Sequence, residues 1–336
     1  MTEASASSPY RTIAVLGAGA WGTALALVAA GAGTKTILWA LEKEVADGIA
    51  ATRENARFLP GVVLPPSLEA TTDIARTMNT DAVLLASPAQ HVRSMLQKLK
   101  DGLKPKVPVV ICAKGVERNS ALLLPEILRE VLPSAEPAML SGPSFAKDVA
   151  KGLPTAVTIG ARLPIAERLA ASLAHGSFRP YVSEDVIGVA LGGAAKNVYA
   201  IACGMVEGAG FGESARAAIL SRGFAELLRL SGPLGAKAET LMGLSGLGDL
   251  VLTATSMSSR NFALGVALGR GASLKAVQGE GKPLAEGALT ASAFVQRAKK
   301  HGVELPIAEC VSAVLEGGLS VKAAAERLLA RPLAKE

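Results

Sequence analysis

Short apolar runs alternate with longer mixed stretches through the first half of the chain. Such runs, bounded by polar or glycine-rich segments, are typical of strands buried in a parallel sheet, and the stretches between them predict the helices that cover it. We therefore expect an α/β fold built on a mostly parallel sheet. The expected strands are Thr12–Leu16, Thr36–Ala40, Asp81–Ala86, Val107–Cys112, Ala138–Leu140, Pro154–Gly160 and Phe178–Val182.

The strand pattern stops after Asp185, and a helical spacing of apolar residues replaces it. The chain has 336 residues, which is long enough for two domains. The change of pattern predicts a loose tail over residues 1–10, an α/β domain over residues 11–184 and an all-helical domain over residues 185–336. The expected helices of the second domain are Val186–Val206, Glu213–Leu230, Arg260–Gly269, Leu284–His301, Pro306–Leu315 and Val321–Ala330.

One expected helix, Val186–Val206, is apolar almost throughout but carries Lys196 at its middle. A membrane span is the first alternative, but a lysine near the bilayer centre costs about 2.5–3.5 kcal/mol, so we favour a buried helix of a non-membrane fold. Gly192 and Gly193 lie one turn before Lys196 and are expected to leave room for a small ligand beside its ammonium. A structural ion pair, or a lysine that reaches out to solvent, is the other alternative.

A glycine-rich turn follows the first expected strand. Gly17, Gly19 and Gly22 form a GxGxxG pattern before an alanine-rich helix. In a dinucleotide-binding domain of the Rossmann type, the first glycine allows the turn, the second lets a pyrophosphate approach, and the third lets the helix close on the strand. The pyrophosphate would bind the free N–H groups of the helix N-terminus. A glycine turn without a ligand is the alternative.

The end of the second expected strand bears on the choice of dinucleotide. An acid at this place commonly binds the ribose of NAD, whereas a basic residue suits the 2′-phosphate of NADP. Here Leu41 is neither, Glu42 suits NAD and Lys43 suits NADP. All three also fit a solvated helix start, so the choice between NAD and NADP stays open.

Two further strand ends carry candidate ligand-binding groups. Lys114 follows Val107–Cys112, and a Ser-Gly-Pro-Ser turn with Gly142 and Ser144 follows Ala138–Leu140. Ligands of open parallel sheets bind beyond the carboxyl ends of the strands. We therefore expect these residues at a site, with a solvated lysine and an ordinary turn as the alternatives.

In the helical half, the segment Gly243–Thr253 is expected to be a glycine-rich loop that leads into Asp249. It is not a P-loop, because no Gly-Lys-Ser/Thr follows. Ser259, Arg260 and Asn261 open a later helix, where a hydroxyl cap, a guanidinium and free N–H groups would suit a phosphate. A capped helix with a solvated arginine is the alternative.

Composition narrows the classes of partner. The chain is 50% hydrophobic and 4% aromatic, and its net charge is +6. The charge suits an anionic ligand, but without a long Lys/Arg run or stacking aromatics we expect no nucleic acid. Three scattered cysteines show no metal or disulfide spacing, and the first residues show no signal peptide, so we expect no metal and a cytoplasmic location.

Seven segments, in this order, resemble the bacterial-type NAD(P)-dependent glycerol-3-phosphate dehydrogenase family: GAGAWGTALA, CAKGVE, SGPSFAKDVAKGLPTAV, IGVALGGAAKNVYAIACGM, GLSGLGDLVLTATS, SSRNFALG and LAEGALTA. The resemblance implies a Rossmann-type domain followed by a helical substrate domain. It also implies reversible hydride transfer between NAD(P)H and C2 of dihydroxyacetone phosphate, which supplies sn-glycerol 3-phosphate for phospholipid synthesis. The implied partner is a small phosphorylated three-carbon substrate. We expect no membrane span in this protein. A homodimer is one option for the assembly.

The resemblance also assigns residues. It makes Lys196 the general acid/base, with Lys114, Asp249 and Thr253 as the other catalytic residues. The implied substrate-binding residues are Lys114, Gly142, Ser144, Lys196, Asp249 and, at the phosphate end, Ser259, Arg260 and Asn261. The implied cofactor-binding residues are Gly17, Gly19, Ala20, Trp21, Gly22, Lys114, Ala146, Arg260, Leu284 and Glu286. The chain departs from the family at Leu41, where the family often carries His or Arg.

The expected chemistry needs a base for the alcohol proton while hydride leaves the same carbon. A free lysine has a pKa of about 10.4, and we expect burial and a nearby Lys114 to lower the pKa of Lys196, with Asp249 and the bound phosphate acting against them. Two rival functions remain: a related hydroxy-acid dehydrogenase, and a nucleotide-binding redox sensor without catalysis.

Overall fold

The computed structural model describes residues 8–278 and 285–332, and the chain forms two compact units. The sheet unit comprises Met1–Lys114 and Leu124–Ala190, and the helical unit comprises Gly115–Leu123 and Leu191–Glu336. The prediction of a parallel-sheet domain followed by a helical domain is confirmed. The predicted boundary between residues 184 and 185 is not tested and stays a prediction.

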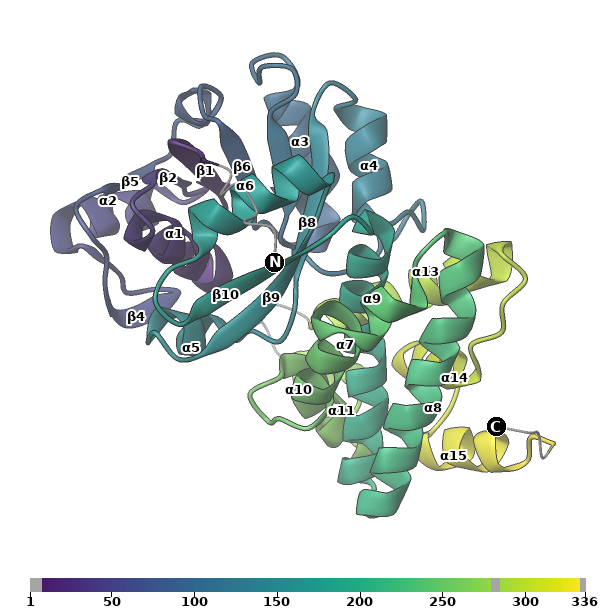
Figure 1. Cartoon of the computed structure of the whole chain (residues 1–336). Helices are drawn as coiled ribbons and strands as arrows, with labels where there is room; N and C mark the ends of the chain where they lie inside the picture. Colours follow the sequence, from purple (N-terminus) through teal and green to yellow (C-terminus); the bar gives the residue numbers. More distant parts are fainter. Residues whose placement is uncertain (1–7, 279–284, 333–336) are drawn as a thin grey trace. The chain divides into compact units, whose positions relative to one another are not determined.

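The sheet unit is built on eight strands in the order β10-β9-β8-β7-β6-β1-β2-β5 (Figure 1). All neighbouring strands run parallel except β8 and β9. From β5 to β8 this is the strand order of a Rossmann domain, in which the order reverses between β1 and β6. The strands are β1 Thr12–Leu16, β2 Lys35–Trp39, β5 Leu68–Thr71, β6 Ala82–Leu85, β7 Pro108–Ile111, β8 Glu136–Ser141, β9 Thr155–Gly160 and β10 Phe178–Ser183.

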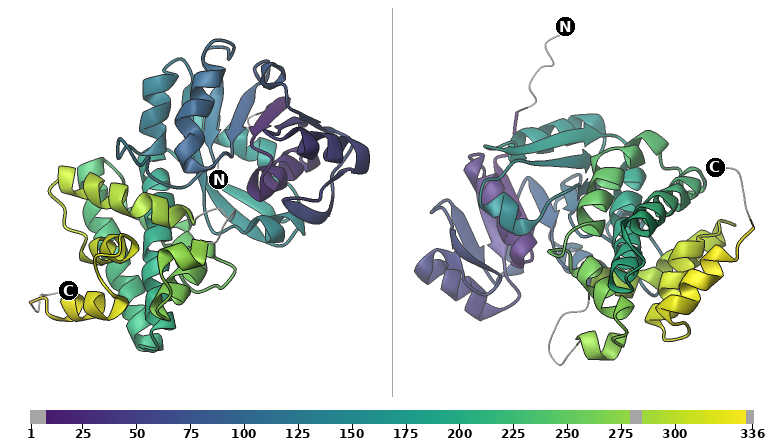
Figure 2. Two further views of the ribbon diagram at one scale, coloured as in Figure 1. Left: turned by 180° about the vertical axis from the view of Figure 1, so that it is seen from behind. Right: turned by 90° about the horizontal axis from the view of Figure 1, so that it is seen from below.

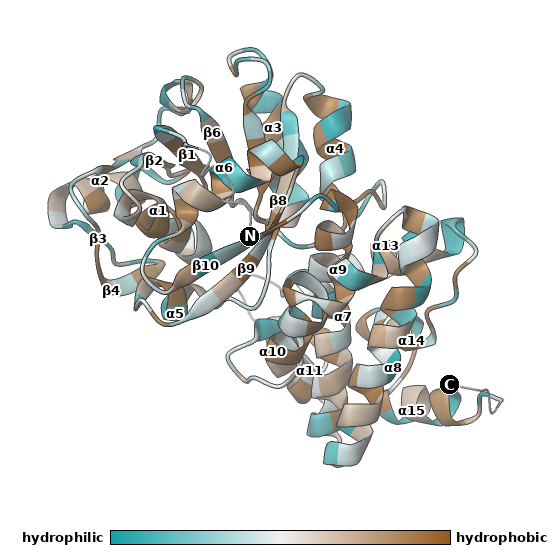
Figure 3. Cartoon of the chain, viewed as in Figure 1, coloured by the Kyte–Doolittle hydropathy of each residue, from teal (hydrophilic) through white to brown (hydrophobic). Residues whose placement is uncertain are grey.

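Helices cover both faces of this sheet. Figures 1 and 2 show α1 (Ala20–Gly31) and α6 (Leu163–Leu173) over one face, and α3 (Val92–Leu99) and α4 (Leu124–Val131) over the other. Colouring by hydropathy shows both hydrophobic and hydrophilic segments around α4 (Figure 3). Its buried residues are Leu124, Pro125, Ile127 and Leu128. A sheet covered on both sides explains why its central strands read as continuous apolar runs.

Three strands of the sheet unit were not predicted. β3 (Glu54–Asn55) and β4 (Leu59–Val63) form a short antiparallel hairpin, and β5 adds the edge strand of the main sheet. Their sequences are polar or contain Pro-Gly, so they carry no apolar run. The hairpin and β5 depend instead on Arg53, whose guanidinium donates to the carbonyl oxygens of Leu64 at 3.2 Å, Leu68 at 2.8 Å and Pro65.

The helical unit contains only helices among its regular elements within the described residues. Two of the predicted helices have the predicted bounds, α11 and α14. The predicted start at Leu284 lies outside the described residues, and α9, α10 and α12 were not predicted. The helices are α7 Val186–Gly208, which begins in the sheet unit, α8 Glu213–Ser231, α9 Ala238–Met242, α10 Asp249–Ala254, α11 Arg260–Gly269, α12 Leu274–Gln278, α13 Glu286–Lys300, α14 Pro306–Leu315 and α15 Val321–Leu329.

Glycines let α7 pack closely against α11. A Cβ at Gly204 would lie 2.2 Å from the carbonyl oxygen of Phe262, and one at Gly208 would lie 2.1 Å from that of Val266. Within the described residues α7 is the helix long and apolar enough to cross a membrane, yet 83% of its most apolar window is buried inside the structure. Such burial is typical of the core helix of a globular unit.

Candidate active site

The glycine turn of the sheet unit has the shape that a dinucleotide requires. Gly17 has φ 114° and lies against the end of β6, where an added Cβ would be 3.1 Å from the backbone of Ala86. A Cβ at Gly22 would come within 1.8 Å of the carbonyl oxygen of Gly17, so the helix closes on the turn. A Cβ at Gly19 would meet nothing within 4 Å, which leaves the N-terminus of α1 open to a pyrophosphate.

Three other predicted cofactor positions gather beside this turn. Ala20 and Trp21 form the first turn of α1, and Ala146 begins α5 (Ala146–Ala150); all three are partly buried and pack against the core of the sheet unit. The indole nitrogen of Trp21 is buried and donates no hydrogen bond. The turn and its surroundings therefore fit a dinucleotide, while the role of each residue stays a prediction.

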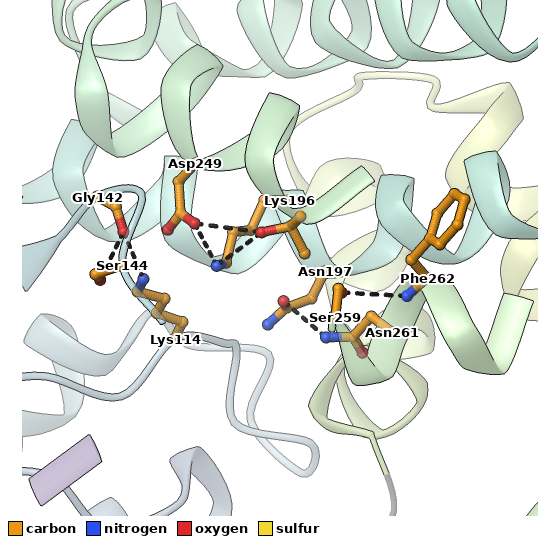
Figure 4. Close-up of polar contacts among 10 residues, drawn as sticks. Lys114, Gly142, Ser144, Lys196, Asn197, Asp249, Ser259, Asn261 and Phe262 are labelled. Atoms are coloured by element: carbon orange, nitrogen blue, oxygen red, sulfur yellow. Dashed lines mark hydrogen bonds and ion pairs between the residues drawn. The ribbon is translucent and has the colours of Figure 1, made fainter. Parts of the chain in front are cut away.

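The sheet unit also brings together the three predicted residues at the ends of β7 and β8. The Lys114 ammonium donates to the carbonyl oxygen of Gly142 at 3.1 Å, and the Ser144 hydroxyl donates to the same oxygen at 3.0 Å (Figure 4). Gly142 has φ 147°, and a Cβ there would lie 2.8 Å from Cα of Val157, so no larger residue fits without movement. The turn thus holds an ammonium and a hydroxyl at the carboxyl edge of the sheet.

The helical unit places Lys196 in a buried polar cluster. Its ammonium lies 2.5 Å from a carboxylate oxygen of Asp249 and donates to the Thr253 hydroxyl at 3.1 Å (Figure 4). Thr253 in turn donates to the same Asp249 oxygen at 3.3 Å. The Lys196 side chain is 10% exposed and that of Asp249 is 1% exposed, so the ion pair is held almost out of water.

The sequence analysis was wrong about the secondary structure of the segment that carries Asp249 and Thr253. The expected loop of Gly243–Thr253 is instead a π-helical turn, Leu244–Gly248, that runs into α10. Asp249 and Thr253 are one helical turn apart on α10, so both side chains reach the same ammonium. The glycines are needed for packing, because a Cβ at Gly246 would lie 2.0 Å from the carbonyl oxygen of Leu241.

Of the two glycines expected to leave room for a ligand, Gly192 instead packs against the protein itself. A Cβ at Gly192 would lie 2.5 Å from the carbonyl oxygen of Ser245 and 2.9 Å from Cα of Gly246. The backbone of the π-helical turn therefore fills the space beside Gly192, whereas the predicted ligand space beside Gly193 is not tested and stays a prediction. This contact brings α10, and with it Asp249, against α7.

The predicted phosphate end lies at the start of α11. The Ser259 hydroxyl caps the helix by accepting from the N–H of Phe262 at 3.2 Å, and Arg260 in the first turn is exposed. The amide of Asn261 bonds inward: it donates to Oδ1 of Asn197 at 2.9 Å and accepts from the N–H of Gly287 at 2.9 Å. Of the predicted cofactor positions near Gly287, Glu286 begins α13 and Leu284 lies outside the described residues.

Asn197 is a buried polar residue beside Lys196 that the sequence analysis did not name among the candidate site residues. It directly follows Lys196, is only 4% exposed and is held by Asn261 (Figure 4). The available signal was its place as the second polar residue in a long apolar helix. Among the described residues, no three His, Cys, Asp or Glu side chains are grouped so that they could hold a metal ion.

A Rossmann sheet with an open glycine turn, joined to a helical unit that buries a lysine, defines the class of dinucleotide-dependent oxidoreductases. Two family models agree with this: NAD-dependent glycerol-3-phosphate dehydrogenase N-terminus matches residues 12–164, and the C-terminus model of the same family matches residues 185–326. The chain belongs to the NAD(P)-dependent glycerol-3-phosphate dehydrogenase family.

Individual relatives give the same result. A glycerol-3-phosphate dehydrogenase [NAD(P)+] of Parvibaculum lavamentivorans is 53% identical over 97% of this chain and 98% of its own length. The crystal structure of glycerol-3-phosphate dehydrogenase from Coxiella burnetii superposes with a TM-score of 0.90, at 37% identity over 96% of this chain and 99% of that one. D-mandelate dehydrogenase, with a TM-score of 0.63 and 14% identity over 94% of this chain and 99% of its own, shares the fold alone.

Proposed function

We propose that this protein catalyses reversible hydride transfer between NAD(P)H and C2 of dihydroxyacetone phosphate, which yields sn-glycerol 3-phosphate for phospholipid synthesis. The observation that carries the proposal is the buried ammonium of Lys196, held by Asp249 and Thr253 in the region that matches the family's C-terminal model. When bound, the nicotinamide supplies or accepts the hydride. The glycine turn, with its open side at Gly19, is the part of this chain that would hold the dinucleotide.

Lys196 moves the proton in this proposal. In the direction of reduction, Nζ donates a proton to the oxygen on C2; in the direction of oxidation, Nζ accepts the hydroxyl proton. The carboxylate of Asp249 stabilises the ammonium form of Lys196, which is the form that reduction needs. Asp249 and Thr253 also fix the direction of Nζ, so little reorganisation is needed when the substrate binds. The predicted approach of Lys114 and its effect on the pKa of Lys196 stay predictions.

The phosphate of the substrate is assigned to Ser259 and Arg260 at the N-terminus of α11. The exposed guanidinium and the free N–H groups of the first turn suit a phosphate dianion. Asn261 supports this end by holding Asn197 and the first turn of α13. Lys114, Gly142 and Ser144 are proposed to line the substrate site from the sheet unit.

Replacing Lys196 with Met tests the assignment. We expect kcat with dihydroxyacetone phosphate to fall by about 10³-fold, because the variant has no group to donate the proton. Lys299→Met, which removes an exposed lysine from α13, is the matched control and should keep full activity. Because the variant removes the Lys196 ammonium from the buried carboxylate of Asp249, Lys196→Met is also made together with Asp249→Asn.

Titration with NADH checks that these variants are folded, and unchanged NADH affinity is expected in all of them. A folded Lys196→Met variant with near-normal kcat would contradict the role of Lys196. A wild-type enzyme that reduces hydroxy-acid precursors faster than dihydroxyacetone phosphate would favour the related hydroxy-acid dehydrogenase. Detectable turnover excludes the non-catalytic redox sensor. The cytoplasmic location is proposed on the sequence argument alone, and a homodimer stays one option for the assembly.

A further inference from the structure

The chain passes from one unit to the other directly after Lys114. The sheet unit stops at Lys114 and resumes at Leu124, and the segment between them, Gly115–Leu123, packs with the helical unit. We call this segment the strap. The Lys114 ammonium is held in the sheet unit by the carbonyl oxygen of Gly142 at 3.1 Å, whereas its backbone continues into the strap. Contacts that fix the strap therefore also fix the backbone from which the Lys114 side chain extends.

The strap folds back on itself. Val116 and Leu123 form an antiparallel bridge, and the N–H of Glu117 donates to the carbonyl oxygen of Leu122 at 3.0 Å. The N–H of Ala121 donates to the carbonyl oxygen of Glu117 at 2.9 Å, and Ala121 has φ 59°. This left-handed conformation is uncommon for a residue with a side chain and persists only where neighbouring contacts hold it. Val116, Ala121 and Leu123 are also buried, so the strap is a packed part of the helical unit.

Ser120 holds the strap closed. Its hydroxyl donates to the carboxylate of Glu117 at 2.5 Å and accepts from the N–H of Leu122 at 3.2 Å. A hydrogen bond from a hydroxyl to a carboxylate is charge-assisted and stronger than one between neutral groups. The carbonyl oxygen of Ser120 also accepts from the ammonium of Lys300, at the end of α13, at 3.3 Å. One residue therefore closes the strap and attaches it to a helix of the helical unit.

We propose that Ser120 is a positioning residue for Lys114. By closing the strap, Ser120 keeps the backbone beyond β7 in one conformation, and the Lys114 side chain then extends from a fixed Cα. A lysine side chain is long and flexible, so the fixed backbone and the carbonyl oxygen of Gly142 together limit where its ammonium lies. The inference rests on the proposed function, because it assumes that Lys114 lines the substrate site.

Ser120→Ala removes the hydroxyl and tests the positioning. We expect kcat/KM for dihydroxyacetone phosphate to fall by about fivefold, because the Lys114 ammonium is held less well, while the affinity for NADH stays unchanged in a calorimetric titration. Ser120→Thr keeps the hydroxyl and should restore kcat/KM to within about twofold of the wild-type value. Ser94→Ala is the matched control, since it removes a hydroxyl that lies on α3 and donates to the carbonyl oxygen of His91.

The same change in a Lys114→Met background separates positioning from a general loss of structure. Lys114→Met alone should lower kcat/KM by about 10²-fold, and adding Ser120→Ala should lower it no further, because the residue that Ser120 positions is gone. Equal effects of Ser120→Ala in both backgrounds, or no effect in the wild-type background, would overturn the inference alone. An unchanged kcat/KM in Lys114→Met would contradict the proposed place of Lys114 in the substrate site, and the inference with it.

Amide hydrogen exchange reports on the strap without turnover. In Ser120→Ala the amides from residue 114 to residue 123 should exchange at least about tenfold faster than in the wild-type protein, whereas Ser94→Ala should leave their exchange unchanged. Exchange at the wild-type rate in Ser120→Ala would show that the hydroxyl does not hold the strap. That result would overturn the inference even for a protein that does not reduce dihydroxyacetone phosphate.

Discussion

Glycine serves opposite purposes in the two units. In the sheet unit, a Cβ at Gly19 would meet nothing within 4 Å, so the missing side chain leaves room for something outside the protein. In the helical unit, a Cβ at Gly204 or Gly246 would lie 2.2 Å or 2.0 Å from a backbone oxygen. There the neighbouring backbone of the protein occupies the space that a side chain would need. A run of glycines in a sequence therefore does not reveal whether the glycines leave room for a ligand or allow close packing of the backbone.

The units also differ in how they treat charge. The acids and bases around the end of β2 are paired at the surface, where solvent screens them. The helical unit buries the Lys196–Asp249 pair and also buries Glu226 of α8, which is 3% exposed. Burial also makes Glu226 sensitive to pH, because it raises the pKa of that carboxyl. The three predictions that follow test the contrast in glycine and in charge, from the largest effect to the smallest.

The largest effect is expected at the contact between α7 and α11. Gly204→Ala should destabilise the protein by about 3 kcal/mol or more, because the methyl group meets the backbone of Phe262 and no flexible side chain can yield. Gly48→Ala is the matched control: this helical glycine of α2 (Lys43–Thr52) has nothing within 4 Å of its added Cβ. Alanine there should stabilise the helix by up to about 1 kcal/mol. Urea unfolding measures the stability of both variants. Equal stabilities would contradict the distinction between a glycine in close backbone contact and a glycine with open space beside it.

The next effect concerns the pH dependence of stability. Glu226 accepts hydrogen bonds from the N–H groups of Ile307 at 2.7 Å and Ala308 at 3.3 Å, and from the Tyr199 hydroxyl at 3.2 Å. Burial raises the pKa of Glu226 from 4.5 to about 7, although these donors and Arg229 act to lower it. Because the folded protein binds this proton more tightly than the unfolded chain, its contribution to stability is present below pH 4.5 and lost as the pH rises through 7.

Glu226→Gln should remove that dependence. Between pH 5 and pH 8 the wild-type protein is expected to lose about 2.5 kcal/mol through this group, and the variant should lose correspondingly less. Unfolding in urea at several pH values measures the slope, which is unaffected by any constant cost of the amide. Glu213→Gln, at the exposed start of α8, is the control and should keep the wild-type slope. A variant with the wild-type slope would show that Glu226 titrates normally.

The smallest effect on stability is expected at the glycine turn. Gly19→Ala should change the free energy of unfolding by less than about 1 kcal/mol, because Gly19 has φ −67° and open space beside it. The same methyl group should weaken NADH binding by about tenfold, since it stands where the pyrophosphate approaches. Urea unfolding of this variant measures the free energy of unfolding, and calorimetric titration of the same variant measures the affinity for NADH. Unchanged affinity would mean that the dinucleotide does not approach Gly19.

The fold was largely predictable because most of its strands and helices have a recognisable pattern of apolar residues in their own sequence. Apolar runs marked the strands from β6 to β10, and the helical spacing marked α11 and α14 to the residue. β3, β4 and β5 could not be predicted, since their short polar segments owe their structure to the guanidinium of Arg53 and the amide of Asn55. The segment Gly243–Thr253 was predicted as a loop for a related reason: glycine propensity favours a turn, whereas the helical turn observed there packs closely against Gly192 of α7 and Leu241 of α9.

The sequence by itself determined the family, the glycine turn and the identity of the buried lysine, because these depend on residue types at short spacings along the chain. The tertiary structure alone decided what surrounds them. It showed that the space beside Gly192 is filled by the backbone of Ser245 and Gly246, and that Asn261 holds Asn197. It also paired Glu42 with Arg57 across residues that no local pattern connects. Such contacts join segments far apart in the chain, and only the folded backbone brings their atoms within reach of each other.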